Sequence, residues 1–251
     1  MTASQSAVDS KLSASFGKVL AVQIAAYAVL IVLALIPGIS YGDSDVPSVV
    51  SSTVVGSIAM IALMTVFNPF RDGVAGHVIS VVAGLLSVVC ATTMMLGRAI
   101  FPPDFTGNDF FWMQEGWIAG VGGLLILLIV VSFARQMARE ERSHLIRSLS
   151  HNIVEGVAMI SCAGWCFLPS ILPVDFGESA STTQYVSMPV WGCSVAVVVA
   201  VAVVFGVCSY LWNRDADPEP SANRPWIGRA LLPVMLTGAV VGVASFATVL
   251  L

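Results

Sequence analysis

Seven stretches of this sequence, each about 20 residues long, carry almost no charged side chain, and a helix of that length is what the hydrocarbon core of a bilayer requires. In a chain of 251 residues, 57% apolar and 10% charged, too few charges remain to cover a water-facing surface. The composition excludes a soluble globular protein, a disordered chain and a basic nucleic-acid binder. We therefore expect an all-α integral membrane protein in a lipid bilayer. The seven predicted transmembrane helices span approximately residues 19–37, 46–68, 74–97, 116–134, 152–173, 189–212 and 230–251.

The positions of Lys and Arg predict the orientation, because cytoplasmic loops retain basic residues. With a cytoplasmic N-terminus and an outer C-terminus, ten of the eleven basic residues lie on the cytoplasmic side. Only Arg98 lies outside, where the loops instead carry acidic residues such as Asp104 and Glu178. We therefore expect a multi-pass protein of the cell membrane, and its ten cytoplasmic basic residues are Lys11, Lys18, Arg71, Arg135, Arg139, Arg142, Arg147, Arg214, Arg224 and Arg229.

The domain organisation is simple, because the loops are too short for a separate soluble domain. Residues 1–18 form a predicted cytoplasmic tail, either disordered or a short interfacial helix, and residues 19–251 form one seven-helix membrane domain. The first apolar run could instead be a signal peptide, but it is longer than a usual apolar signal core and no A-x-A site follows it. The basic segment 135–151 is either an amphipathic helix on anionic headgroups or a solvated loop.

The chain contains a possible parallel repeat, in which spans one to three correspond to spans five to seven. Spans one and five both end in an apolar residue and a proline, Ile36-Pro37 and Leu172-Pro173. Spans two and six both end near an Asn followed by Arg-Asp, at Asn68 and at Asn213. Parallel repeats build several transporter folds. The alternative is that loop ends recruit Pro, Asp and Asn without any repeat.

Glu155 is the one acidic residue that this topology places inside a span. His151 precedes it by four residues and Arg147 by eight, so a helix puts all three on one face. Ionisable groups within spans usually face the protein interior or a water-filled cavity. We identify Glu155, His151, Arg147 and His77, which lies near the cytoplasmic end of the third span, as candidate polar residues of an inner mouth. The alternative is that Glu155 is a helix N-terminal acid that interacts with the helix dipole and with Arg147.

Small residues predict close helix packing. The pairs Gly116/Gly120 and Gly238/Gly242 recur at the four-residue spacing that lets helix backbones approach. The same faces could pack within one chain, against a membrane-protein partner or in a homo-oligomer. Trp117 lies near the outer end of the fourth span, where we expect its ring at the headgroup level.

No catalytic, metal or cofactor site emerges from the motifs. Residues 38–42 match G-x-S-x-G, but they lie outside, whereas all three histidines lie on the cytoplasmic side. The histidines have no Cys or acid at the spacing of a metal site, and we predict no cofactor. An enzyme is therefore the third-ranked class.

Two function classes remain. The first is a small-solute transporter or permease component, with a polar path between the helix triplets. The second is a non-transporting accessory or assembly subunit of a membrane complex. The scarcity of charged residues in the spans favours the subunit. Polar side chains within the spans favour the transporter, and these side chains belong to Gln23, Ser51, Ser52, Thr53, Ser57, Thr92 and Thr93.

Overall fold

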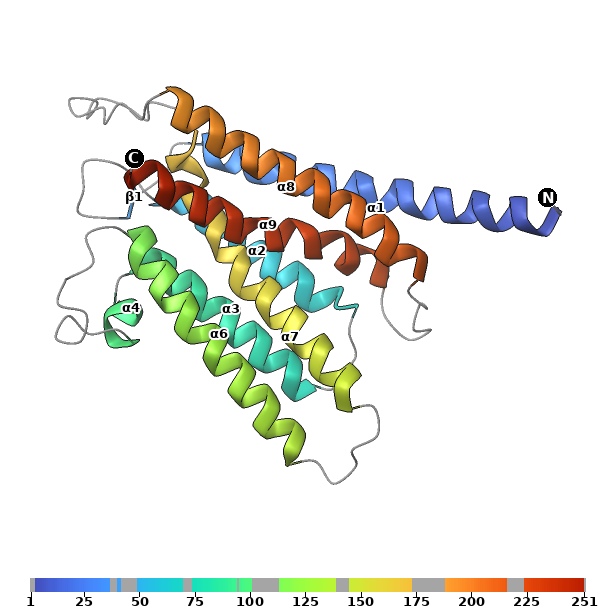
Figure 1. Cartoon of the computed structure of the whole chain (residues 1–251), viewed down its shortest axis with the longest axis horizontal. Helices are drawn as coiled ribbons and strands as arrows, with labels where there is room; N and C mark the ends of the chain where they lie inside the picture. Colours follow the sequence, from blue (N-terminus) through green and yellow to red (C-terminus); the bar gives the residue numbers. More distant parts are fainter. Residues whose placement is uncertain are drawn as a thin grey trace.

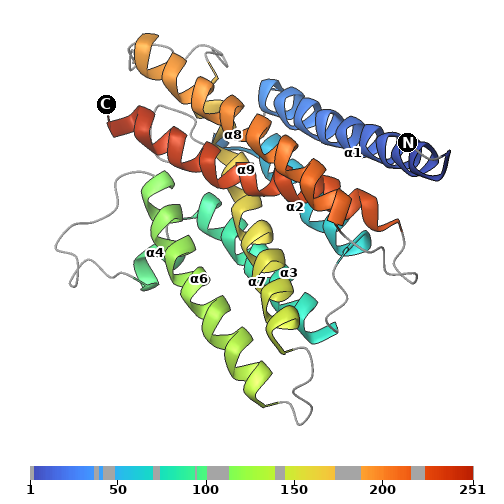
Figure 2. The same cartoon turned by 45° about the vertical axis from the view of Figure 1, so that its right-hand side comes forward.

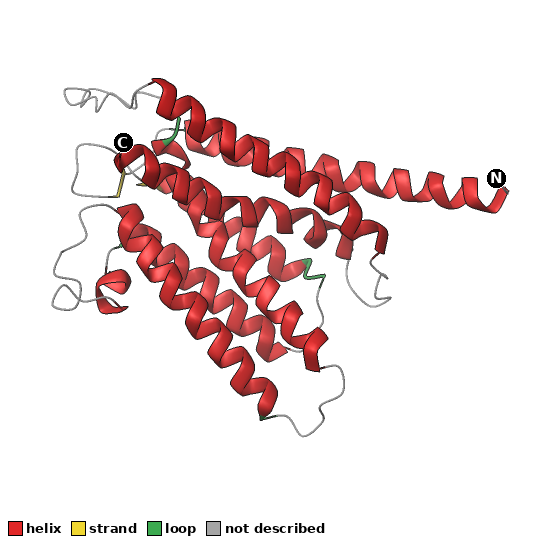
Figure 3. Cartoon of the chain, viewed as in Figure 1, coloured by secondary structure: helices red, strands yellow, loops and turns green. Residues whose placement is uncertain are grey.

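A computed structural model describes residues 3–36, 40–41, 49–69, 74–93, 95–100, 113–138, 145–172, 188–215 and 224–250. Nearly all of these residues are helical, apart from two short paired strands (Figures 1 and 3). The elements are α1 (Ala3–Leu35), β1 (Ser40–Tyr41), β2 (Val49–Val50), α2 (Ser51–Val66), α3 (Val74–Thr92), α4 (Met95–Ile100), α6 (Met113–Met137), α7 (Leu145–Cys162), the 3-10 helix η1 (Ala163–Ser170), α8 (Met188–Asp215) and α9 (Pro225–Leu250).

Six helical segments are long and apolar enough to cross a membrane, and they lie in α1, α3, α6, α7 with η1, α8 and α9. The protein is therefore an all-helical, multi-pass membrane protein, as its composition predicts. The remaining predicted span corresponds to α2, which has 16 residues. At 1.5 Å per residue, α2 is about 24 Å long and falls short of the ~30 Å hydrocarbon core.

Some helix ends differ from the predicted ones. Residues 3–18 continue the first span within α1, a single helix of 33 residues, and no proline interrupts them. The second predicted span starts at residue 46, but α2 starts at Ser51 because the chain before it is extended, with Val49 and Val50 paired antiparallel to β1.

The third predicted span reaches residue 97, but α3 ends at Thr92. Both the backbone N–H and the hydroxyl of Thr93 donate to the carbonyl oxygen of Val89, each at 2.8 Å, and they close this end of the helix. A separate short helix, α4, follows and packs against α6.

The helices form two groups that meet along α7, η1 and α9. On one side α3 and α6 pack against each other and against α7, whereas on the other side α8 lies along α9. Figures 1 and 2 show this division from two directions. The first helix, α1, packs against α2, α8 and α9. The outermost faces carry large exposed apolar side chains, as expected beside hydrocarbon, for example Ile24, Val82, Ile126, Val130, Val203 and Val207.

The interior between these groups is built around buried aromatic rings. The Trp117 side chain is only 2% exposed, and its ring centroid lies 5.4 Å from that of Phe167. Its indole N–H donates to Ser87 Oγ at 3.2 Å, and that hydroxyl donates to the Ile160 carbonyl at 2.8 Å. This chain of hydrogen bonds satisfies the indole within the bundle. The headgroup-level position of Trp117 stays a prediction.

The fifth span changes from α-helix to 3-10 helix at Ala163, six residues before Pro169. Hydroxyl groups of α2 bond to backbone carbonyls here: Ser57 Oγ donates to Cys162 at 3.4 Å, and Thr53 Oγ1 donates to Cys166 at 3.2 Å. A break in a membrane helix needs such partners, since lipid offers none.

Candidate functional site

Glu155 lies on α7 and is 2% exposed. It is the seventh residue of the apolar segment Leu149–Ser170, which places it about 9 Å along the helix from the start of that segment. A carboxylate at this depth needs partners, because neither lipid nor apolar side chains stabilise its charge.

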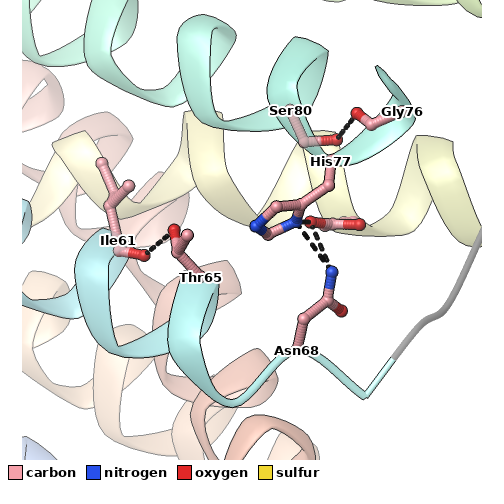
Figure 4. A network of polar contacts seen from close by, with 7 residues as sticks. Ile61, Thr65, Asn68, Gly76, His77 and Ser80 are labelled. Atoms are coloured by element: carbon pink, nitrogen blue, oxygen red, sulfur yellow. Dashed lines mark hydrogen bonds and ion pairs between the residues drawn. The ribbon is translucent and has the colours of Figure 1, made fainter. Parts of the chain in front are cut away.

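Two residues from other elements supply those partners. His77 on α3 forms an ion pair and hydrogen bond through Nδ1 with Glu155 Oε1. Asn68, which follows α2, donates from Nδ2 to the same oxygen at 3.0 Å and lies 2.8 Å from His77 Nδ1. Figure 4 shows the Asn68 amide, on the chain after α2, and the His77 ring, on α3, pointing toward each other. We call these three residues, Asn68, His77 and Glu155, the Glu155 cluster.

The chain before α3 brings Asn68 to this position. The helix α2 ends at Val66, and the Phe67 backbone N–H bonds back to the Leu63 carbonyl at 2.9 Å. Asn68 comes next and Pro69 cannot continue the helix. The start of α9 packs tightly on this turn, since a Cβ added to Gly228 meets the Phe67 carbonyl oxygen at 2.1 Å. The turn and its amide are thereby held against the first turn of α3.

A second polar contact lies beside His77, at Gly76. A Cβ added to Gly76 meets Asn152 Oδ1 at 2.3 Å and an Arg135 guanidinium nitrogen at 2.6 Å. The side chains of α6 and α7 thus lie directly on the α3 backbone. Within the described part of the chain, the buried Asn152 Oδ1 accepts no hydrogen bond.

The structure brings together two of the four predicted inner-mouth residues. His77 and Glu155 meet across the contact between α3 and α7. His151 lies one turn before Glu155 and is partly exposed, whereas Glu155 is bonded to His77 and Asn68. The backbone of Arg147 belongs to α7, but its side chain lies outside the described part of the chain.

Asn68 is a site residue that the sequence analysis used only as a repeat marker. Two signals could have identified it. An Asn-Pro pair ends an apolar run, and a His follows nine residues later, at the start of the next run. Since consecutive membrane helices joined by a short loop are antiparallel neighbours, these two side chains start near each other.

The four glycines predicted for helix packing lie on α6 and α9. Gly116 and Gly120 are buried on α6. A Cβ on Gly238 meets the Ser161 carbonyl oxygen at 2.3 Å, and a Cβ on Gly242 meets the Trp117 ring at 2.2 Å. The α9 pair thus allows close contact with α7 and with α6.

Several polar residues of the predicted path form hydrogen bonds between or within helices. Gln23 on α1 donates to Ser209 on α8 at 2.9 Å. Thr53 and Ser57 bond to the carbonyls of the fifth span. Thr92 and Thr93 bond to carbonyls of their own helix.

The arrangement can hold a proton or an ion pair at one end of the bundle. Among the described residues, no group of three or more His, Cys, Asp or Glu could hold a metal ion. The sequence matches no known family profile, and neither a curated protein nor a solved structure matches the chain.

Proposed function

We propose that the protein is a small-solute permease, or the membrane component of one, with the Glu155 cluster at its inner mouth. The observation that carries this proposal is the ion pair between the partly exposed His77 and the buried Glu155, which lie on two apolar helices. Paired ionisable residues inside membrane helices mark ion and substrate pathways in many transporters. A pair that joins α3 to α7 can act as a gate, because its attraction holds the two helices together.

The proposal includes the finer topology. We propose seven spans, with the N-terminus in the cytoplasm and the C-terminus outside, and α2 is then a short span. This topology places ten of the eleven basic residues on the cytoplasmic side. This topology puts the Glu155 cluster at the cytoplasmic side of the cell membrane. A reporter fused after Leu251 should be active only outside, and activity only in the cytoplasm would overturn this orientation.

The parallel repeat has less support. Spans two and six should correspond, but α2 has 16 residues and α8 has 28. Superposition of α1, α2 and α3 on α7, α8 and α9 tests the repeat, and failure of the two triplets to superpose would remove it. The permease proposal does not depend on it.

Transport can be tested with purified protein in liposomes. We expect uptake of at least one class among radiolabelled amino acids, sugars, nucleobases and polyamines, above that of protein-free vesicles. Glu155→Gln should slow this uptake about tenfold or more, equivalent to roughly 1.4 kcal/mol. Glu115→Gln, which removes a carboxylate at the start of α6, is the matched control and should leave uptake unchanged. Failure of every probe class would overturn the proposal.

A second candidate is a non-transporting accessory or assembly subunit. Hydrogen bonds between helices favour the subunit, because polar side chains used to join helices do not line a path. These bonds join Gln23 to Ser209, Gln114 to Ser245 and Thr53 to the Cys166 carbonyl. Copurification from native membranes separates the two candidates. A stoichiometric membrane-protein partner combined with absent uptake would favour the subunit, whereas uptake by the isolated chain or its homo-oligomer would favour the permease.

A further inference from the structure

We propose that the Glu155 cluster binds a proton, and that this proton is the ion linked to solute movement, an inference that rests on the permease function proposed above. The cluster offers two neighbouring proton sites, Nδ1 of His77 and the carboxylate of Glu155, which already share one hydrogen bond. The inference identifies the coupling ion and assigns a separate role to Asn68.

The position of Asn68 fits two alternative proton locations. Its Nδ2 lies 3.0 Å from Glu155 Oε1 and 2.8 Å from His77 Nδ1. When Nδ1 carries a proton, that nitrogen cannot accept, and the amide donates to the carboxylate. When the proton is on the carboxyl group, the free lone pair of Nδ1 can accept from the amide. Asn68 therefore remains hydrogen-bonded in both states, which makes it a positioning residue for proton transfer.

The two proton sites differ in how exposed they are at the surface of the bundle. The His77 side chain is 22% exposed, whereas the Glu155 side chain is 2% exposed. His77 thus lies between the bundle surface and the buried carboxylate. Figure 4 shows its ring between the two helices, with one ring nitrogen turned toward Asn68 and the other turned away. A proton from the aqueous phase reaches the imidazole first and the carboxylate second.

The donors around Glu155 suit a proton better than a metal cation. Sodium, magnesium and calcium ions prefer several oxygen ligands. Here Oε1 faces an amide N–H donor and an imidazole nitrogen, both of which stabilise a carboxylate by hydrogen bonding.

Other charged groups near the cluster come from three helices. Arg135 of α6 lies against Gly76, the neighbour of His77. His151 lies one turn away on α7, and Arg229 lies at the start of α9, next to the residue that packs on the turn before Asn68.

The proton step involves only N–H and O–H bonds. In the ion pair, the imidazolium Nδ1–H donates to the Glu155 carboxylate. Transfer of this proton breaks the Nδ1–H bond, forms the carboxyl O–H bond and neutralises both groups. The neutral ring keeps its Nε2–H bond, so a further proton taken from water binds at the free Nδ1 and leaves a cationic ring beside a neutral acid. The attraction that joins α3 to α7 is then lost. Release of that proton to water, followed by return of the first proton to Nδ1, restores the ion pair.

The first test measures proton movement during uptake of the transported probe. A pH-sensitive dye is trapped in the liposomes, and the radiolabelled probe that the wild type transports is added. We expect a change of internal pH that accompanies uptake, and faster uptake when a pH gradient is imposed. His77→Gln should abolish the pH change, whereas Glu115→Gln, which removes a carboxylate at the start of α6, should retain it. Uptake without proton movement and without response to a gradient would overturn the proton linkage and leave the permease function standing.

The second test measures proton binding itself and needs no transported probe. Infrared difference spectra of the reconstituted protein between about pH 5 and about pH 8, the range in which imidazole titrates, detect a protonated carboxyl group by its C=O stretch. We expect a band in the wild type that is absent from Glu155→Gln and is retained by Glu115→Gln. Glu155→Asp should shift this band rather than remove it, which separates loss of the carboxyl group from misfolding.

A role for Asn68 predicts a further change in the same spectra. Asn68→Leu removes the donor from both states, so the frequency of the Glu155 C=O band should differ from that of the wild type. Identical wild-type and Glu155→Gln spectra would overturn the proton site, even if the liposomes take up solute. If no probe is transported, the permease proposal fails, and the infrared result alone then decides the proton site.

Discussion

Replacement of Gly164 by alanine tests the contact between η1 and α9. A Cβ on Gly164 lies 1.9 Å from the carbonyl oxygen of Gly238 and 2.6 Å from its carbonyl carbon. Both atoms belong to the backbone, so no side-chain rotation can relieve the clash. The two helices must therefore separate by more than about 1 Å before the methyl group reaches an ordinary contact distance.

The cost can be estimated from this separation. Overpacking a tight core costs about 1–3 kcal/mol, and the upper end applies here because two backbones must move. The same displacement strains the hydrogen bond from Trp165 Nε1 to the Val234 carbonyl, which is 2.8 Å long and crosses the same contact. For a chain of this size, 1 kcal/mol shifts the melting temperature by about 2–4 °C. We expect Gly164→Ala to melt about 6–12 °C below the wild type.

Buried cysteines provide the assay. Cys162 and Cys166 are fully buried, and a fluorogenic thiol reagent reaches them only when the bundle opens in detergent. The exposed Cys193 and Cys208 are changed to Ser in all variants to remove their background signal.

The matched control is Gly122→Ala on α6. A Cβ on Gly122 meets no atom within 4 Å, so alanine brings only its better helix propensity, worth up to about 1 kcal/mol. The control should melt at or slightly above the wild-type temperature. A Gly164→Ala protein that melts within about 2 °C of the wild type would refute the close contact between η1 and α9.

Three further substitutions probe single interactions in the same thiol assay. Ser87→Ala should cost about 1–3 kcal/mol, because it leaves the buried N–H of Trp117 without its acceptor, and an unchanged melting temperature would show that the indole finds another partner. Gly76→Ala displaces flexible side-chain ends, including that of Asn152, rather than backbone, so it should cost only about 1 kcal/mol, and a loss as large as that of Gly164→Ala would contradict this reasoning. Gln23→Leu removes a hydrogen bond to α8 inside the membrane and should cost about 0.6 kcal/mol, with a melting shift of no more than about 3 °C.

The spans were predictable because a bilayer imposes one strong requirement, a long apolar run. Their exact ends were less predictable, since they depend on contacts distant in sequence. The start of α2 at Ser51 depends on pairing of Val49 and Val50 with Tyr41 and Ser40, eight and ten positions earlier. The end of α3 at Thr92 depends on a threonine that bonds to its own helix, and threonine also occurs within helices.

Glu155 and its grouping with His77 were predictable, but the choice of His77 rather than His151 as its bonded partner was not. A four-residue spacing places His151 and Glu155 on one face of α7. The spacing rule does not say which residue of a neighbouring helix meets that face. Side chains on one face form a bond only if no better partner comes from a neighbouring helix. The helix α3 supplies that partner in His77, and the turn after α2 supplies Asn68.

A small-residue stripe on α3 explains how this partner comes within reach. Gly76, Ser80 and Gly84 recur every four residues and are all buried. A Cβ on Gly84 meets Met159 Cβ of α7 at 2.9 Å, and Gly76 contacts Asn152 of the same helix. Without side chains at these positions the two backbones approach closely, as small-residue motifs allow in membranes, and the short reach of a glutamate then suffices to meet an imidazole on α3. This stripe is present in the sequence. It lets the third and fifth spans pack together, and this packing favours His77 over His151 as the partner of Glu155.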